Sequence, residues 1–172
     1  MRPVAEKERV LDLLAEGRDA GAVHLHAPIV IDVARALGAK GRPVRAIYAE
    51  KPMAPTWGEA RRMAATCQEN GVVLAFNHQR RFGAPFRKAK ELLDQGAIGE
   101  LTRLEAFTSN LYDWGTHWFD MLFFFNDQVP AVSVMGQMDV ARESTVFGAM
   151  LDTSGLSYVT FENGVNGLLT TG

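Results

Sequence analysis

The chain has 172 residues, of which 47% are hydrophobic and 22% are charged, so its composition is that of a globular protein and not of a disordered or fibrous one. Its 18 Lys and Arg against 20 Asp and Glu give a formal charge of −2. The sequence contains no long basic run to neutralise phosphates, so we expect no nucleic-acid partner.

Other features of composition bear on the compartment. Cys67 is the single cysteine, so it cannot form an internal disulfide, and we interpret it as a core side chain in a reducing compartment. The first residues carry charges throughout and lack the apolar core of a signal peptide. The most apolar stretch, at 118–125, is short and interrupted by Asp120. We therefore expect no membrane association and a cytoplasmic location.

The first half of the chain alternates helical and strand periodicities, which is typical of an α/β layer structure. Helices are predicted at residues 4–16, 29–37 and 56–70, and strands at 22–26, 44–49 and 72–76. Pro28 suits the start of the second helix, and the spacing from Thr56 to Glu59 fits a capping box at the third. The strand at 72–76 is continuously apolar, as in parallel sheets buried on both faces.

The second half has a different pattern. A helix is predicted from Pro85 to before Gly96, a half-solvated strand at 101–108, a helix at 115–125 and strands thereafter. Asn163-Gly164 between two apolar runs predicts a two-residue hairpin turn. The predicted fold class is α/β, with a partial Rossmann-like parallel sheet in residues 1–82, followed by an α+β domain with an open, mainly antiparallel sheet in residues 83–172.

Glu50-Lys51-Pro52 ends a predicted buried strand. Ligands of open parallel sheets bind beyond the carboxyl ends of the strands. A lysine at that position can stabilise negative charge on a substrate oxygen, and the proline fixes the backbone that directs it. A solvated strand end before a turn is the alternative interpretation.

The segment at 111–120 carries Asp113, His117 and Asp120, which a helix would place on one face. Nearby aromatic residues would make the surroundings apolar and allow the histidine pKa to be tuned, so we interpret the group as an acid/base station. The alternative is a core histidine that is hydrogen-bonded by its neighbours.

A third group ends the strand at 72–76. The motif FNHQRRF supplies Asn77, His78, Arg80 and Arg81, and arginines at this edge could bind a polar substrate or a nucleotide. A solvated basic loop explains them as well.

Taken in order, EKP, N-H-x-R-R-F and D-x-G-x-H-x-x-D resemble the Gfo/Idh/MocA family of NAD(P)-dependent oxidoreductases, typified by glucose-fructose oxidoreductase and inositol dehydrogenase. The resemblance extends from the DAGAVHLHAP segment to FENGVNGLLTTG, nearly the whole chain. It implies a Rossmann domain that binds the nicotinamide cofactor and a second, sheet-containing domain that completes the substrate site.

The resemblance also implies roles for individual residues. Lys51, Asp113 and His117 match the catalytic positions, and Asp120 matches a further acidic position that looks structural. Residues of the cofactor site are Pro28, Glu50, Lys51 and Pro52; those of the substrate site are Asn77, Arg81 and His117. The implied reaction is hydride transfer between NAD or NADP and a hydroxyl or carbonyl of a sugar, polyol or related compound, with His117 as acid/base. Association of copies through the second-domain sheet is implied as well.

Some family features do not occur in the sequence. A dinucleotide-binding turn carries G-x-G-x-x-G, but no two glycines here are separated by one residue. Around Pro28, Ala27, Ile29 and Asp32 replace residues that are usual in the family. Two interpretations remain: a fragment of a longer oxidoreductase, or a shortened non-catalytic relative that acts as a binding or association module. In both cases little NAD(P) affinity is expected of the chain as given.

A rival hypothesis from another class uses His24 and His26, which a strand would direct to one face, as in metal-dependent hydrolases. No matching set of carboxylates accompanies them. We therefore predict no metal site.

Overall fold

A computed structural model describes residues 46–142, 144–146 and 148–172. The chain forms two compact units, Met1–Asn77 and His78–Gly172. Each is described by itself below. The elements predicted before residue 46, together with His24, His26 and Pro28, lie outside the described residues.

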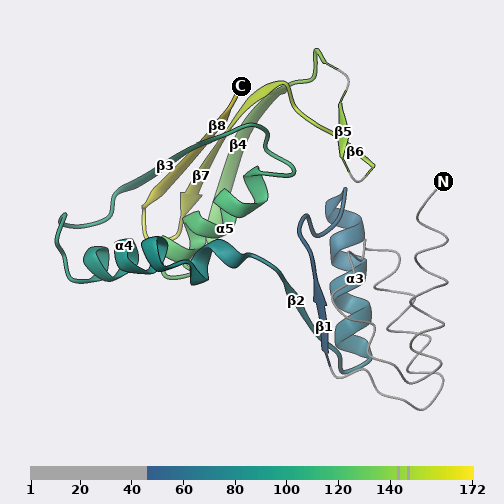
Figure 1. The fold of residues 1–172 in the computed structure, drawn as a ribbon, viewed down its shortest axis with the longest axis horizontal. Coiled ribbons are helices and arrows are strands. Elements are labelled where there is room, and N and C mark those ends of the chain that lie inside the picture. Colours follow the sequence, from purple (N-terminus) through teal and green to yellow (C-terminus); the bar gives the residue numbers. More distant parts are fainter. Residues whose placement is uncertain (1–45, 143, 147) are drawn as a thin grey trace. The chain divides into compact units, whose positions relative to one another are not determined.

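The described part of the first unit is a parallel strand pair with one helix (Figure 1). Strand β1 is Ala46–Ala49, helix α3 is Trp57–Glu69, and strand β2 is Val73–Phe76. Their core consists of Ile47, Ala49, Met63, Cys67 and Val72. Cys67 is 1% exposed, and burial raises the pKa of its thiol. The cysteine is thus a core side chain, as predicted.

Two sequence predictions about this unit have different outcomes. The predicted N-cap is confirmed, because the Thr56 hydroxyl accepts a hydrogen bond from the backbone N–H of Glu59 (3.2 Å). The Glu59 carboxylate accepts from the Thr56 hydroxyl (3.1 Å), and not from the Thr56 backbone N–H as a full capping box requires. The expectation that β2 is buried on both faces is wrong: Val73 is 64% exposed. Leu74 and Phe76 pack on the core that α3 covers, so alternate residues of β2 point away from it.

The second unit begins with a 3₁₀ turn, η1 (Gln79–Phe82), and helix α4 (Ala84–Asp94). Strand β3 (Arg103–Thr108), helix α5 (Gly115–Phe125) and strand β4 (Ala131–Asp139) follow. The short strands β5 (Thr145–Val146) and β6 (Ala149–Met150) pair with each other. The unit ends with β7 (Ser154–Phe161) and β8 (Asn166–Thr171).

The main sheet of this unit has the strand order β3-β8-β7-β4. β3 is parallel to β8, whereas β8 with β7 and β7 with β4 are antiparallel. The predicted fold class is therefore confirmed, with a parallel α/β part followed by a mainly antiparallel sheet. No helix in the described ranges has the length and apolar character that a bilayer crossing requires.

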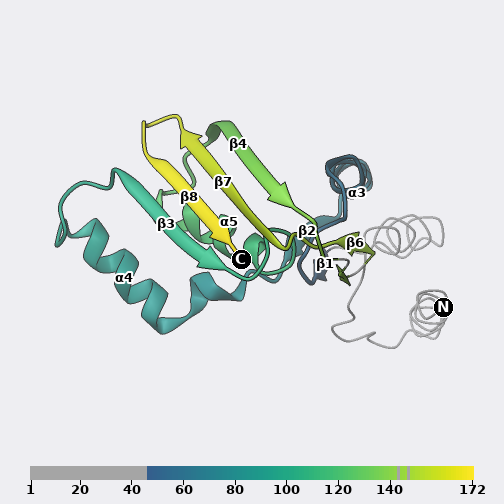
Figure 2. The ribbon, with the colours of Figure 1, turned by 90° about the horizontal axis from the view of Figure 1, so that it is seen from above.

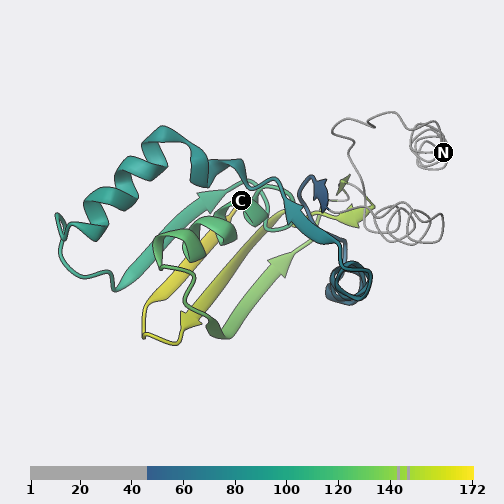
Figure 3. The ribbon, with the colours of Figure 1, turned by 90° about the horizontal axis from the view of Figure 1, so that it is seen from below.

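Helix α5 lies on one face of this sheet but leaves β4 exposed, and within the described residues of this unit no helix lies on the opposite face (Figures 2 and 3). Leu122 of α5 packs with Val159, Phe161 and Val165, three residues of the β7–β8 hairpin, in a buried cluster. Gly167 on β8 permits this approach, since a Cβ there would lie 2.8 Å from Cδ1 of Leu122. The position of α5 on the sheet thus depends on a missing side chain.

The turn between β7 and β8 is longer than the predicted two-residue turn. The backbone N–H of Gly164 donates to the carbonyl of Phe161 (3.0 Å), and only Gly164 has positive φ (+82°) in this loop. A two-residue type I′ turn needs positive φ at both central positions. Asn163 instead exchanges side-chain amide hydrogen bonds with Asn126 at the end of α5 (2.8 and 3.3 Å). The longer β7–β8 loop is therefore accompanied by a tertiary contact between Asn163 and Asn126.

We predict that Gly164→Ala lowers the free energy of unfolding by about 1 kcal/mol, because an L side chain is strained at this φ. Gly164→Asn is the matched control and should lose less than half as much, since asparagine tolerates the left-handed region. Urea unfolding followed by circular dichroism measures both. Equal stability of the wild type and Gly164→Ala would contradict the assignment.

Candidate active site

Side chains at the carboxyl ends of β1 and β2 form one hydrogen-bonded chain. The backbone N–H of Asn77 donates to the carbonyl of Ala49 (2.8 Å). Its side chain donates through Nδ2 to Oε1 of Glu50 (2.8 Å) and accepts through Oδ1 from the Tyr48 hydroxyl (2.7 Å). Asn77 and Glu50 are 27 residues apart in the sequence. They meet because the carboxyl ends of two parallel strands lie at the same edge of the sheet. Asn77 therefore bridges the two strand ends.

Lys51 and Pro52 follow at this edge. Lys51 is half-buried, Pro52 is buried, and the peptide bond between them is cis. The three predicted cofactor-site residues Glu50, Lys51 and Pro52 are thus consecutive at the carboxyl edge of the parallel pair. That is where an ammonium group can stabilise negative charge on a bound oxygen.

In the second unit, the turn at 110–114 leads into α5. The side-chain oxygen of Asn110 accepts from the backbone N–H groups of Asp113 (2.7 Å) and Trp114 (3.1 Å). The Asn110 carbonyl accepts from Gly115 (2.9 Å), and a Cβ on Gly115 would lie 3.0 Å from that oxygen. Asn110 therefore satisfies amides that the beginning of a helix leaves without an intrahelical partner.

This turn changes one prediction. Asp113, His117 and Asp120 were expected on one face of a helix, but α5 begins at Gly115 and Asp113 lies before it. The reason is the Asn110 side chain, which hydrogen-bonds the amides that another helical turn would have used. His117 and Asp120 do lie on α5. The Asp113 carbonyl accepts from the Thr116 hydroxyl (2.9 Å), which ties the turn to the first residues of the helix.

Asp152 supports the same turn from the sheet. Its carboxylate is buried and accepts from the backbone N–H of Leu111 (2.7 Å) and from the Thr171 hydroxyl (2.5 Å). Sequence reasoning missed both Asn110 and Asp152. The capping signal of an asparagine before a helix could have identified Asn110. No local signal identifies Asp152, which is 41 residues from Leu111.

His117 is buried on the first turn of α5, with 4% of its surface exposed. Its ring meets the His78 ring edge-to-face at 5.9 Å between centroids and lies 6.4 Å from the Trp114 ring. Aromatic neighbours reduce water access around the imidazole. A histidine in such a setting can act as an acid or base, because a neutral ring has one donor and one acceptor nitrogen.

Asp120, one turn further along α5, pairs with Arg81 of η1. Nε of Arg81 donates to Oδ2 of Asp120 (3.0 Å), and Nη2 of Arg81 donates to Oδ1. The side chains are 27% and 12% exposed. This two-bond pair holds η1 against α5 and agrees with a structural role for Asp120.

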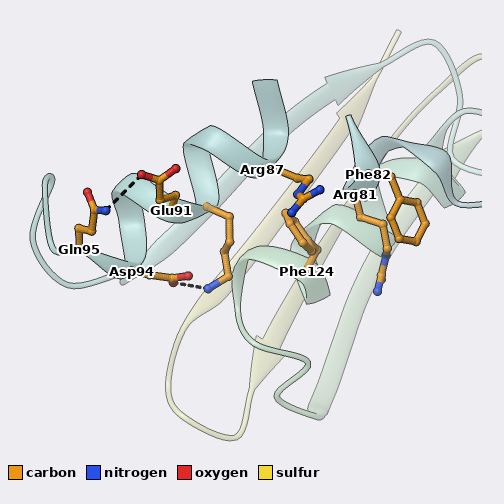
Figure 4. A pocket seen from close by; sticks show the side chains of 8 residues that line it. Arg81, Phe82, Arg87, Glu91, Asp94, Gln95 and Phe124 are labelled. Atoms are coloured by element: carbon orange, nitrogen blue, oxygen red, sulfur yellow. Dashed lines mark hydrogen bonds and ion pairs between the residues drawn. The ribbon is translucent and has the colours of Figure 1, made fainter. Parts of the chain in front are cut away.

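A hollow of about 810 Å³ opens beside Arg81, between α4 and the end of α5 (Figure 4). Its lining consists of Arg81, Phe82, Arg87, Lys90, Glu91, Asp94, Gln95 and Phe124. Lys90 forms ion pairs with Asp94 and Asp127. Burial lowers the pKa of Lys90, but the hydrogen bonds and negative charges of these two aspartates outweigh it, so the pKa is raised overall. Neither Asp113 nor His117 lines the hollow, so we do not place the chemistry there.

The structure therefore distributes the predicted catalytic residues over both units. Lys51 belongs to the first unit, and Asp113 and His117 belong to the second. In the described ranges, no three His, Cys, Asp or Glu side chains gather as a metal site would require.

Comparison with known proteins identifies relatives. No protein-family model matches the chain. It is 32% identical over 94 residues to 2,7-anhydro-N-acetylneuraminate hydratase of Mediterraneibacter gnavus, covering 55% of this chain and 25% of that protein. It is 32% identical over 98 residues to dTDP-3,4-didehydro-2,6-dideoxy-alpha-D-glucose 3-reductase of Streptomyces violaceoruber, covering 55% and 28%. With scyllo-inositol 2-dehydrogenase (NADP(+)) of Bacillus subtilis, 25% identity extends over 136 residues, covering 67% and 38%.

A solved structure with the same fold is the WlbA dehydrogenase of Bordetella pertussis, in complex with NADH and UDP-GlcNAcA. The TM-score is 0.71 at 23% identity, over 94% of this chain and 54% of that one. The present chain thus spans about half the length of this protein and less of the three relatives.

The relatives found by sequence include a sugar reductase and an inositol dehydrogenase, and the fold, a parallel sheet followed by a second sheet unit, is that of a solved dehydrogenase. These findings agree with the resemblance to oxidoreductases that the motifs indicate.

We predict that Arg81→Lys lowers the free energy of unfolding by about 1 kcal/mol, because an ammonium group cannot make both hydrogen bonds to Asp120. Arg87→Lys is the matched control: Arg87 is exposed on α4, and its replacement should leave stability unchanged. Chemical unfolding of both variants provides the measurement. A loss of the same size in Arg87→Lys would contradict the role of the pair.

Proposed function

We propose that the chain is part of an oxidoreductase that transfers hydride between NAD or NADP and a hydroxyl or carbonyl of a sugar, polyol or related compound. The observation that carries the proposal is His117, a buried histidine on the first turn of α5 in a chain related to sugar and inositol oxidoreductases. The relatives' names concern sugar derivatives and an inositol, which supports a polyhydroxylated substrate.

In this proposal, His117 accepts the proton of the substrate hydroxyl during oxidation and returns it during reduction. Asp113 lies on the turn before α5 and orients the imidazole or hydrogen-bonds the same hydroxyl. Lys51 stabilises the negative charge that develops on the reacting oxygen. Positioning these groups accounts for the support that Asn110 and Asp152 give to the turn.

The residues at the ends of β1 and β2 fit a nicotinamide cofactor. Asn77 and Tyr48 hold Glu50, so the backbone that presents Lys51 and Pro52 is braced at the edge where dinucleotides bind in such sheets. The cofactor, when bound, supplies the hydride acceptor or donor. Pro28, the remaining predicted cofactor contact, lies outside the described residues.

Substrate contacts are proposed for Asn77, Arg81 and His117. Asp120 occupies Nε and Nη2 of Arg81, which leaves Nη1 for a substrate oxygen. Asn77 already uses both side-chain atoms in the strand-end chain, so it would contact substrate only by sharing its oxygen or its second amide hydrogen.

Association of copies through the second-unit sheet remains part of the proposal. Every residue of β4 is exposed, and Val134 and Met138, which alternate onto the same face of the strand, are 70% and 62% exposed. Apolar side chains along a sheet face provide a surface for a second copy.

The proposal is tested by following absorbance of reduced nicotinamide during reaction with a panel of sugars and inositols. The assay uses the chain joined to the sequence encoded upstream of Met1, with NAD and NADP in separate arms. We expect Lys51→Ala and His117→Ala to lower kcat/KM by about 100-fold or more, the usual effect of losing charge stabilisation or a general acid/base.

Lys88→Ala is the matched control for the lysine, because Lys88 is an exposed residue of α4 paired with Glu91. It should retain wild-type activity. Full activity in both site variants would overturn the assigned roles, and absence of hydride transfer with every substrate and both cofactors would overturn the function.

A further inference from the structure

Arg80 is stacked on two tryptophans beside the candidate active site. Its guanidinium carbon lies 4.8 Å from the ring centroid of Trp118 and 6.0 Å from that of Trp114. Cation–π attraction favours both contacts. The side chain is half-buried, so it is held in place yet remains accessible to a ligand.

The adjacent arginines of QRRF use their guanidinium groups differently. Arg81 directs two of its nitrogens at the carboxylate of Asp120. Among the described residues, no carboxylate or carbonyl accepts a hydrogen bond from the Arg80 guanidinium. A cation–π contact draws on the positive charge of the guanidinium and gives its N–H donors no oxygen acceptor. Arg80 therefore keeps a fork of donors that matches a carboxylate or a phosphate.

Arg80 and His117 both have the Trp114 ring as a neighbour. The Trp114 ring contacts the guanidinium of Arg80, and its centroid lies 6.4 Å from that of the His117 ring. One indole is thus shared by the candidate acid/base and the cation. A sugar whose hydroxyl reaches His117 can carry an anionic group that reaches Arg80.

The charges nearby do not neutralise Arg80. Asp120 of α5 pairs with Arg81. Arg80 contacts the indole rings of Trp114, just before α5, and of Trp118, on α5, and these rings stabilise a cation without compensating its charge. A positive group held in this way favours an anion in the adjoining space more than a neutral hydroxyl.

We propose that Arg80 selects substrates that carry an anionic oxygen group, so that the substrate class is acidic or phosphorylated sugars instead of neutral polyols. The inference rests on the proposed function, since it assumes that His117 faces the reacting hydroxyl. The shared chemistry is a planar or tetrahedral oxyanion, and carboxylate and phosphate are the two sources to be distinguished.

The test is direct binding, without turnover, to the full chain. Isothermal titration calorimetry or saturation-transfer NMR compares D-glucuronate and D-glucose 6-phosphate with D-glucose, which has the same ring but no charge. We expect the preferred anionic sugar to bind about tenfold or more tightly than glucose, because a charge-assisted hydrogen-bonded pair gives a factor of this size. The stronger of the two arms identifies carboxylate or phosphate.

Arg80→Gln should reduce this ratio to near one, and Arg80→Lys should keep only part of it, since lysine retains the charge but not the fork. Arg87→Gln removes an arginine charge from the exposed surface of α4 and should leave the ratio unchanged. Thermal unfolding checks that the variants fold, and where Arg80→Gln does not fold, the partial loss of preference in Arg80→Lys decides.

Equal binding of glucose and both anionic sugars, or no binding of either anion, overturns the proposal. The proposal is also overturned if Arg80→Gln still binds the anionic sugar more tightly than glucose, or if Arg87→Gln loses this preference to the same extent as Arg80→Gln. These outcomes are separate from the test of the proposed function. Hydride transfer with neutral polyols alone would support the proposed function and contradict the anionic substrate class. A preference for anionic sugars without hydride transfer would support the anionic ligand class and contradict the proposed function.

Discussion

The start of α5 depends on three hydrogen bonds to the backbone N–H groups of Leu111, Asp113 and Trp114. Asn110 accepts from two of these amides, and Asp152 accepts from the third. Each such intramolecular hydrogen bond stabilises the fold by about 0.5–1.5 kcal/mol. Because the acceptors come from the turn itself and from the sheet, the helix begins at one defined place, and the side chain at its third position, His117, has a defined direction.

A comparable constraint acts at the ends of β1 and β2. The side chain of Asn77 has one acceptor and two donor hydrogens, and it uses them on Tyr48 and Glu50 across the strand pair. The residues that precede Lys51 are therefore braced from a neighbouring strand. In both units, an asparagine side chain, Asn77 or Asn110, makes two of the hydrogen bonds that hold the residues nearest the proposed chemistry.

Much of the local structure could be predicted from the sequence. The Thr56 N-cap, the helix at 115–125 and the parallel followed by antiparallel order of elements need only periodicity and turn chemistry. The ordered motifs also indicated oxidoreductases, and the named relatives agree with them. The roles given to Lys51, Asp113 and His117 remain predictions, because position alone does not measure what a side chain does.

The positions of the helices and strands, and the residues able to perform chemistry, follow from neighbours along the chain and could be read from the sequence. Which of the two adjacent arginines is neutralised follows from contacts in the fold, because Asp120 pairs with Arg81 and the indole of Trp118 lies against Arg80. The loop at Asn163 likewise follows from such a contact, because a partner 37 residues away exchanges side-chain hydrogen bonds with it. The physical reason is that hydrogen bonds and ring contacts are made through space, and local sequence carries no record of the partner.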